Sequence, residues 1–173
     1  MSRTPDTIST LRDVLGHCRT IAVVGLSPQW HRPSYFAAKY MQSHGYRIIP
    51  VNPLVAREDG SILGERCFAS VVEAAQAIAQ QGGRIDLVDC FRKSDDIPPL
   101  AEEAIAIGAR CLWLQLGVVN EEAAEGAEAA PPGHGPSGRA HTPAPHCAPG
   151  RSCLLYTSPS PRDRTRSRMP SSA

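Results

Sequence analysis

The residues best suited to bind a charged ligand lie in one turn between an apolar run and the start of a helix. Residues 21–24 read Ile-Ala-Val-Val, and a run without polar alternation is typical of a strand covered on both faces. Gly25 ends the run, and a residue without Cβ lets the chain turn sharply and lets a ligand approach the backbone. Pro33 and Ser34 then begin a helix whose first amide groups face the turn, which suits a phosphate.

This turn by itself leaves two interpretations open. The strict G-x-G-x-x-G pattern is absent, because Ser27 stands two residues after Gly25. An ordinary strand-to-helix turn therefore fits the local sequence as well as a nucleotide site does.

The end of the next predicted strand narrows the kind of nucleotide. Residues 46–51 form that strand and are followed by Asn52 and Pro53, and no acid occurs between Gly25 and Glu58. A dinucleotide-binding fold expects an Asp or Glu near this point to hold the ribose hydroxyl groups. A ribose that carries its own phosphate would be repelled by such a carboxylate. The pattern therefore disfavours NAD and permits NADP or coenzyme A, although an Asn-Pro turn that only ends a strand fits equally well.

Taken in order, the motifs resemble a known family. The chain is similar to the small CoA-binding proteins of bacteria, whose single domain resembles the amino-terminal CoA-binding domain of the succinyl-CoA synthetase α subunit. The resemblance covers about residues 11–130, and an ordered series is more specific than a single glycine. The motifs that carry it are Ala-Val-Val-Gly-Leu-Ser-Pro (22–28), His-Arg-Pro-Ser-Tyr (31–35), His-Gly-Tyr (44–46), Ile-Pro-Val-Asn-Pro (49–53), Ile-Leu-Gly-Glu (62–65), Asp-Leu-Val-Asp (86–89), Phe-Arg (91–92) and Trp-Leu-Gln-Leu-Gly (113–117).

The resemblance implies that coenzyme A, or an acyl-CoA, binds across the carboxyl ends of the strands. The turn after Gly25 would surround the diphosphate, Arg32 and Ser34 would contact phosphate, and Asn52 would lie beside the adenosine. Gln115 would line the pantetheine path. No catalytic or metal-binding residue is implied. The complete set of implied binding residues is Gly25, Leu26, Ser27, Pro28, Arg32, Pro33, Ser34, Asn52, Pro53, Phe91, Arg92, Gln115 and Gly117.

The remaining pattern predicts alternating strands and helices. Such alternation favours right-handed crossovers and an α/β, Rossmann-like three-layer sandwich with a mostly parallel sheet. Residues 57–65 are expected to form a turn-rich connection. Strands are expected at 21–24, 46–51, 85–90 and 111–116, and helices at 6–17, 33–41, 70–80, 94–107 and from 121.

The pattern changes after Ala130. Residues 131–152 are crowded with Pro, Gly, His and Ser, a composition that cannot bury enough apolar surface to fold. We interpret this segment as frame-shifted and disordered, so that the last strand of the sheet is lost and the chain is truncated. Residues 153–173 resemble a translated sequencing adaptor and are expected to be disordered as well, which leaves residues 1–130 as the CoA-binding domain.

Charge and cysteine content limit the partners and the cellular location that we expect for this chain. Residues 1–130 hold 12 Lys or Arg against 16 Asp or Glu, so the domain is mildly acidic, and we expect neither a nucleic-acid nor a membrane partner. No signal peptide or membrane-length apolar span is present, which predicts a cytoplasmic location. A homo-oligomer and an unknown partner enzyme both stay open. Four cysteines in the domain are expected to be buried, reduced thiols: Cys18, Cys67, Cys90 and Cys111.

Three functional classes survive. A non-catalytic or regulatory CoA-binding module is favoured by the motif series and by the absence of a nucleophile and base pair near the turn. The second class is an NADP-linked or CoA-ligase-related enzyme fragment, which would need a further domain. The third is an interaction scaffold that binds no nucleotide, because a fold does not establish a function.

Overall fold

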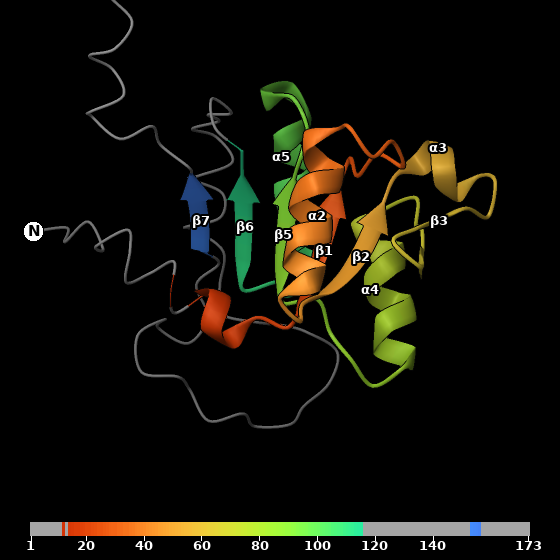
Figure 1. The fold of residues 1–173 in the computed structure, drawn as a ribbon. Helices are drawn as coiled ribbons and strands as arrows, with labels where there is room; N and C mark the ends of the chain where they lie inside the picture. Colours follow the sequence, from red (N-terminus) through yellow and green to blue (C-terminus); the bar gives the residue numbers. More distant parts are fainter. Residues whose placement is uncertain (1–11, 13, 116–152, 157–173) are drawn as a thin grey trace, which may run out of the picture.

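A parallel sheet forms the centre of the molecule (Figure 1). The computed structural model describes residues 12, 14–115 and 153–156. All four pairings within this sheet are parallel, as the alternating pattern predicts. The strand order is β2-β1-β5-β6-β7, with β1 at Thr20–Val24, β2 at Arg47–Val51, β5 at Leu87–Cys90, β6 at Cys111–Leu114 and β7 at Cys153–Tyr156.

Helices cover both faces of the sheet and complete the predicted three-layer, Rossmann-like sandwich (Figure 1). On one face, Ala38 of α2 (Pro33–Ser43) shares a buried cluster with Ile21 and Ile48. On the other face, α4 (Val71–Gln80) and α5 (Ile97–Ala106) pack on the alternate side chains of the same strands. None of the helices in the described part of the chain is both long and apolar enough to cross a membrane.

The starts of α4 and α5 follow from local sequence. Ser70 caps α4 by accepting a hydrogen bond from the amide of Glu73, and the Glu73 carboxylate accepts one from the amide of Ala69, the residue before the cap. A 3₁₀ turn, η1 (Ser94–Asp96), precedes α5 and occupies the first part of the helix predicted over 94–107. Pro at the first turn of α5 removes no helical hydrogen bond.

A short helix precedes the stretch predicted as a turn-rich connection, residues 57–65, and a small strand pair lies within and just after it. Helix α3 (Pro53–Ala56) is capped by the side chain of Asn52. Strands β3 (Ser61–Ile62) and β4 (Glu65–Arg66) form an antiparallel pair. Elements of two to four residues are too short to produce a hydrophobic period, so the pattern could not predict them.

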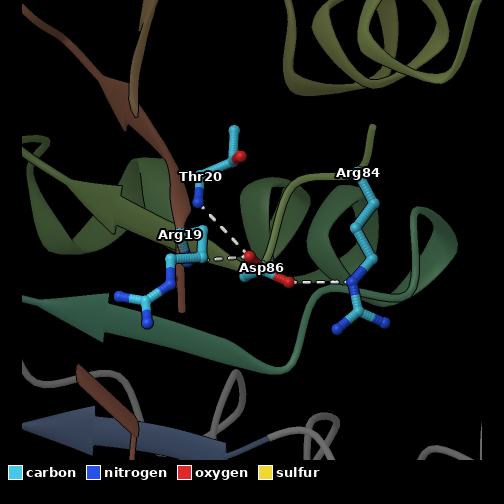
Figure 2. Close-up of polar contacts among 4 residues, drawn as sticks. All are labelled: Arg19, Thr20, Arg84 and Asp86. Carbon is cyan, nitrogen blue, oxygen red and sulfur yellow. Dashed lines mark hydrogen bonds and ion pairs between the residues drawn. The ribbon is translucent and has the colours of Figure 1, made fainter. Parts of the chain in front are cut away.

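A buried carboxylate fixes the amino-terminal ends of β1 and β5, as Figure 2 shows. Asp86 accepts hydrogen bonds from the amides of Arg19, at 2.9 Å, and Thr20, at 3.2 Å. Its other oxygen pairs with Nε of Arg84 at 2.8 Å. Asp86 therefore sets where the two central strands begin, at the end of the sheet opposite Gly25.

The fifth strand differs from expectation. We expected residues 153–173 to lack regular structure, but Cys153–Tyr156 pairs with β6 as β7. The open edge of β6 provides unpaired backbone groups, and the sequence Cys-Leu-Leu-Tyr is able to extend along it. Of the helix predicted at 6–17, the structure describes residues 12 and 14–17, which are helical. The helix predicted from 121 and the segment 131–152 lie outside the described residues.

Candidate functional site

Gly25 lies at the carboxyl edge of the sheet, where both its backbone conformation and its surroundings exclude a side chain. Its φ is +80°, a left-handed conformation, and its amide donates to the carbonyl oxygen of Val51 at 2.9 Å. A Cβ at this position would lie 2.6 Å from the carbonyl oxygen of Phe91. The structure therefore requires glycine here for both conformation and space.

The loop after Gly25 is held by two serine side chains. The Ser34 hydroxyl accepts a hydrogen bond from the amide of Ser27 at 3.1 Å, and the Ser27 hydroxyl accepts one from the amide of Gln29 at 3.2 Å. Ser34 is buried at the first turn of α2. Both serines of the predicted site thus shape the loop, and the contact of Ser34 with phosphate stays a prediction.

Asn52 joins the loop after β1 to the element after β2. Its side-chain amide donates to the carbonyl oxygen of Leu26 at 2.9 Å, while its oxygen accepts from the amide of Leu54 at 3.1 Å. The side chain of Leu26 is fully buried, so Leu26 can offer a ligand only its backbone. The structure therefore brings together the two segments that the sequence motifs single out.

The two predicted arginines differ in their surroundings. Arg32 caps the start of α2, is exposed, and donates through Nε to the side-chain oxygen of Gln29 at 3.1 Å. Arg92 follows β5 and lies 3.7 Å from the carboxylate of Asp96. An exposed guanidinium beside a helix start suits an anion. Arg32 contacts a neutral side-chain amide, whereas the charge of Arg92 is partly balanced by the Asp96 carboxylate.

A cavity of about 230 Å³ opens beside Gly25, on the face covered by α4 and α5. Pockets that enclose a whole small molecule usually measure about 300–1,000 Å³. This smaller cavity would therefore hold only part of a nucleotide. Among the predicted site residues, it is lined by Gly25, Pro53 and Arg92. Its other lining residues are Val24, Val51, Ala69, Ser70, Val71, Asp95, Asp96, Pro99, Leu100 and Glu103.

The start of α4 in this cavity is already occupied by a carboxylate. Glu103 of α5 accepts a hydrogen bond from the amide of Val71 at 3.1 Å. Together with Asp95 and Asp96 it gives the cavity three carboxylates against the guanidinium of Arg92. Phosphate is therefore disfavoured in the cavity, whereas hydroxyl and amino groups that donate hydrogen bonds are favoured.

Sequence reasoning missed the contribution of α4 and α5 to this cavity. The pattern Ser70-x-x-Glu73 is a capping box, which marks the start of a helix that follows a strand. Such a start lies at the carboxyl edge of a parallel sheet, so this signal could have identified Ser70 and Val71. No local signal pairs Glu103 with Val71, which lie 32 residues apart.

The remaining predicted residues lie apart from the cavity. Gln115 follows β6 and donates to the carboxylate of Asp89 at 2.6 Å. Asp89 is buried in β5, and desolvation raises its pKa to about 7 even though the hydrogen bond from Gln115 acts in the opposite direction. Phe91 is half-buried against the α2-side cluster. Pro28 is exposed in the loop, Pro33 is exposed at the first position of α2, and Gly117 lies outside the described residues.

Four cysteines are buried and form no disulfide among the described residues, as the sequence predicts: Cys18, Cys67, Cys90 and Cys111. Burial raises the pKa of the Cys67 thiol and raises that of Cys90 far above its usual range. A thiol must ionise to act as a nucleophile, so Cys67 and Cys90 are poorly suited to that role. Among the described residues, no three His, Cys, Asp or Glu side chains are grouped as a metal site would need.

The fold and the edge of the sheet define the class of protein. Strand order reverses at β1, because β2 lies on one side of it and β5 on the other. In open α/β sheets, ligands bind at such a switch point, outside the carboxyl ends of the strands. Gly25 and Phe91 lie at this point, so the molecule is a Rossmann-like α/β protein with its candidate site where this class binds ligands.

The chain belongs to the CoA binding domain family, whose model matches residues 19–135. It is 39% identical over 113 residues to the uncharacterized protein YneT of Bacillus subtilis (strain 168), covering 65% of this chain and 76% of YneT. The family resemblance inferred from the motifs is therefore confirmed.

Solved structures share the fold. A hypothetical protein from Pyrococcus horikoshii OT3 superposes with a TM-score of 0.61 at 32% identity, covering 73% of this chain and 84% of that one. A Thermus thermophilus protein, cell-free ID.343, superposes with a TM-score of 0.59 at 28% identity, covering 68% and 81% of the two chains. The predicted fold class is confirmed by these structures.

Proposed function

We propose that this chain binds coenzyme A or an acyl-CoA at the switch point, without catalysing a reaction. The observation that carries the proposal is the left-handed Gly25 beneath the Phe91 carbonyl, followed by a loop that ends at the exposed Arg32 and the start of α2. Membership of the CoA binding domain family supports a ligand of this class.

The charge distribution supports an orientation for the ligand. From Val14 to Arg57 the chain holds five Arg or Lys and no Asp or Glu. The β1–α2 loop and the Asn52–Pro53 corner both belong to this stretch. The phosphates therefore lie on the side of Arg32, and the acidic cavity on the α5 side takes hydroxyl or amino groups of the nucleoside.

The serine chemistry near the turn supports a binding role over a catalytic one. The hydroxyls of Ser27 and Ser34 each accept a backbone hydrogen bond within the loop. Within the described part of the chain, neither is bonded to a histidine or a carboxylate that would remove its proton. The two serines are thus placed to shape the loop.

Isothermal titration of the full chain with coenzyme A, acetyl-CoA, NADP and NAD tests the proposal. We expect binding of coenzyme A or acetyl-CoA and weaker or no binding of NAD. Tight NADP binding with no response to either CoA compound would reject it in favour of an NADP-linked enzyme fragment. If none of the four compounds binds, the proposal is rejected in favour of an interaction scaffold.

Arg32→Ala tests the assigned phosphate contact. Loss of a charged hydrogen bond should weaken CoA binding by about 1–3 kcal/mol. Arg110→Ala is the matched control, because Arg110 is also exposed but precedes β6 at the opposite edge of the sheet. An unchanged affinity in Arg32→Ala would remove Arg32 from the site, whereas equal losses in both variants would indicate a general charge effect.

A further inference from the structure

Aromatic side chains gather on the outer side of α2 and its preceding loop. Trp30, Phe36 and Tyr40 are 70%, 56% and 66% exposed. The rings of Trp30 and Phe36 meet edge to face with centroids 6.5 Å apart, and those of Tyr40 and His44 lie 4.1 Å apart. We call these four residues the aromatic face. Figure 1 shows α2 lying over the sheet on the side opposite α4.

The aromatic face contributes little to the core of its own domain. The residues that α2 buries are Ser34 and Ala38, which turn toward the sheet. Phe36 and Tyr40 are one helical turn apart on the opposite side, with Lys39 between them. Large exposed aromatics grouped on one helix face are typical of the centre of a protein interface.

Charge limits what can cover this face. Arg32 and Lys39 are the cations of α2 and its cap, and no acid lies near them in sequence. A single-stranded nucleic acid requires a longer series of cations along its backbone. A second copy of the aromatic face is a suitable partner, because the exposed Lys39 of each copy can lie over a ring of the other copy.

We propose that two copies of this chain associate through the aromatic face, with α2 packed against α2 about a twofold axis. Such an interface is closed and self-complementary, which is the commonest arrangement of soluble homodimers. Three aromatics, each burying about 150–250 Å² when fully covered and here more than half exposed, supply on the order of 300–400 Å² per copy. That is nearly half of the about 800 Å² per partner of a standard interface.

Sedimentation velocity of the full chain, between about 1 and 100 μM, tests the proposal. We expect the sedimentation coefficient to rise from monomer to dimer across this range. Phe36→Ser with Tyr40→Ser should raise the dimer dissociation constant about tenfold or more. Leu54→Ser is the matched control, because Leu54 is a 70% exposed apolar residue of α3 and lies outside the aromatic face. A monomer at all concentrations, or a double variant that dimerises like the parent chain, overturns the proposal.

Disulfide trapping provides a second measurement that does not depend on removing rings. With Cys147 and Cys153 replaced by serine, Lys39→Cys places an exposed thiol within the aromatic face, and Glu102→Cys places one on α5. Mild oxidation should yield a covalent dimer from Lys39→Cys and little from Glu102→Cys. Equal yields from the two variants would show random collision and would contradict the α2 pairing.

Discussion

A side chain at Gly25 would place its Cβ 2.6 Å from the carbonyl oxygen of Phe91, the residue that directly follows the neighbouring strand β5. Phe91 in turn donates its amide to the carbonyl oxygen of Val24 at 2.9 Å. The two chain segments therefore approach one another as closely as backbone allows. Gly25 links the conformation of the ligand loop to the position of β5.

Gly25→Ala should destabilise the fold by about 2–4 kcal/mol, from the left-handed φ together with a clash against backbone that cannot rotate away. Gly64→Ala is the matched control: Gly64 has φ +82° but nothing within 4 Å of its Cβ position. It should lose only about 1 kcal/mol. Urea denaturation measures the free energy of unfolding of both variants. Equal losses would show that the clash with Phe91 does not contribute to the destabilisation by Gly25→Ala.

Asn52→Ala should remove the side-chain connection between the loop after β1 and the start of α3. We expect a loss of about 1–3 kcal/mol, because the Leu26 carbonyl and the Leu54 amide each lose a partner. Asn52→Asp retains an acceptor for Leu54 and loses the donor to Leu26, so it separates the two contributions. Urea denaturation measures the stability of both variants, and an undiminished stability in Asn52→Ala would show that water replaces these contacts.

Asp86→Ala should destabilise the chain by about 2–4 kcal/mol, since it leaves two strand amides without their acceptor. Arg84→Ala removes only the ion pair of Figure 2. The Arg84 side chain is half exposed, so its loss should cost about 1 kcal/mol or less. Thermal and urea unfolding distinguish the two. Equal destabilisation would assign the role of Asp86 to the ion pair rather than to the amides.

Asp89 should make stability fall as pH rises. Burial raises its folded-state pKa from 3.8 to about 7, so between these values the folded chain holds a proton that the unfolded chain releases. The stability from this proton is complete below about pH 4 and is lost as pH approaches about 7, at about 1.4 kcal/mol per pKa unit.

Asp89→Asn removes this titration and leaves an oxygen that can accept from Gln115. The variant should be more stable than the parent at pH 8 and closer to it at pH 5, as measured by urea unfolding. Asp95→Asn, at an exposed position, is the control. The same pH profile for Asp89→Asn and the parent would contradict the assignment.

Residues 131–173 can be tested at the level of the source nucleotides. We expect the reading frame to shift after Ala130 and the codons for residues 153–163 to match an adaptor. The source reads would show both. An intact frame through residues 130–152 would contradict the frameshift. Codons for residues 153–163 that do not match an adaptor would make β7 a native fifth strand.

The main elements and the edge that carries the site follow from local sequence. The apolar run before Gly25 and the Ser70 cap each act within a few residues, so propensity and periodicity are sufficient to predict them. The pair β3 and β4, helix α3 and the pairing of β7 were not predicted. They are short, and they depend on partners elsewhere in the chain.

The sequence by itself determined the alternation of strands and helices, the glycine turn and the family, because each rests on neighbouring residues or on an ordered series of motifs. Only the tertiary structure decided that Phe91 covers Gly25, that Glu103 occupies the start of α4, and that Asn52 holds Leu26. The members of these three pairs lie 66, 32 and 26 residues apart in the chain, in that order. Their contact depends on strand order and crossover, which no local pattern encodes.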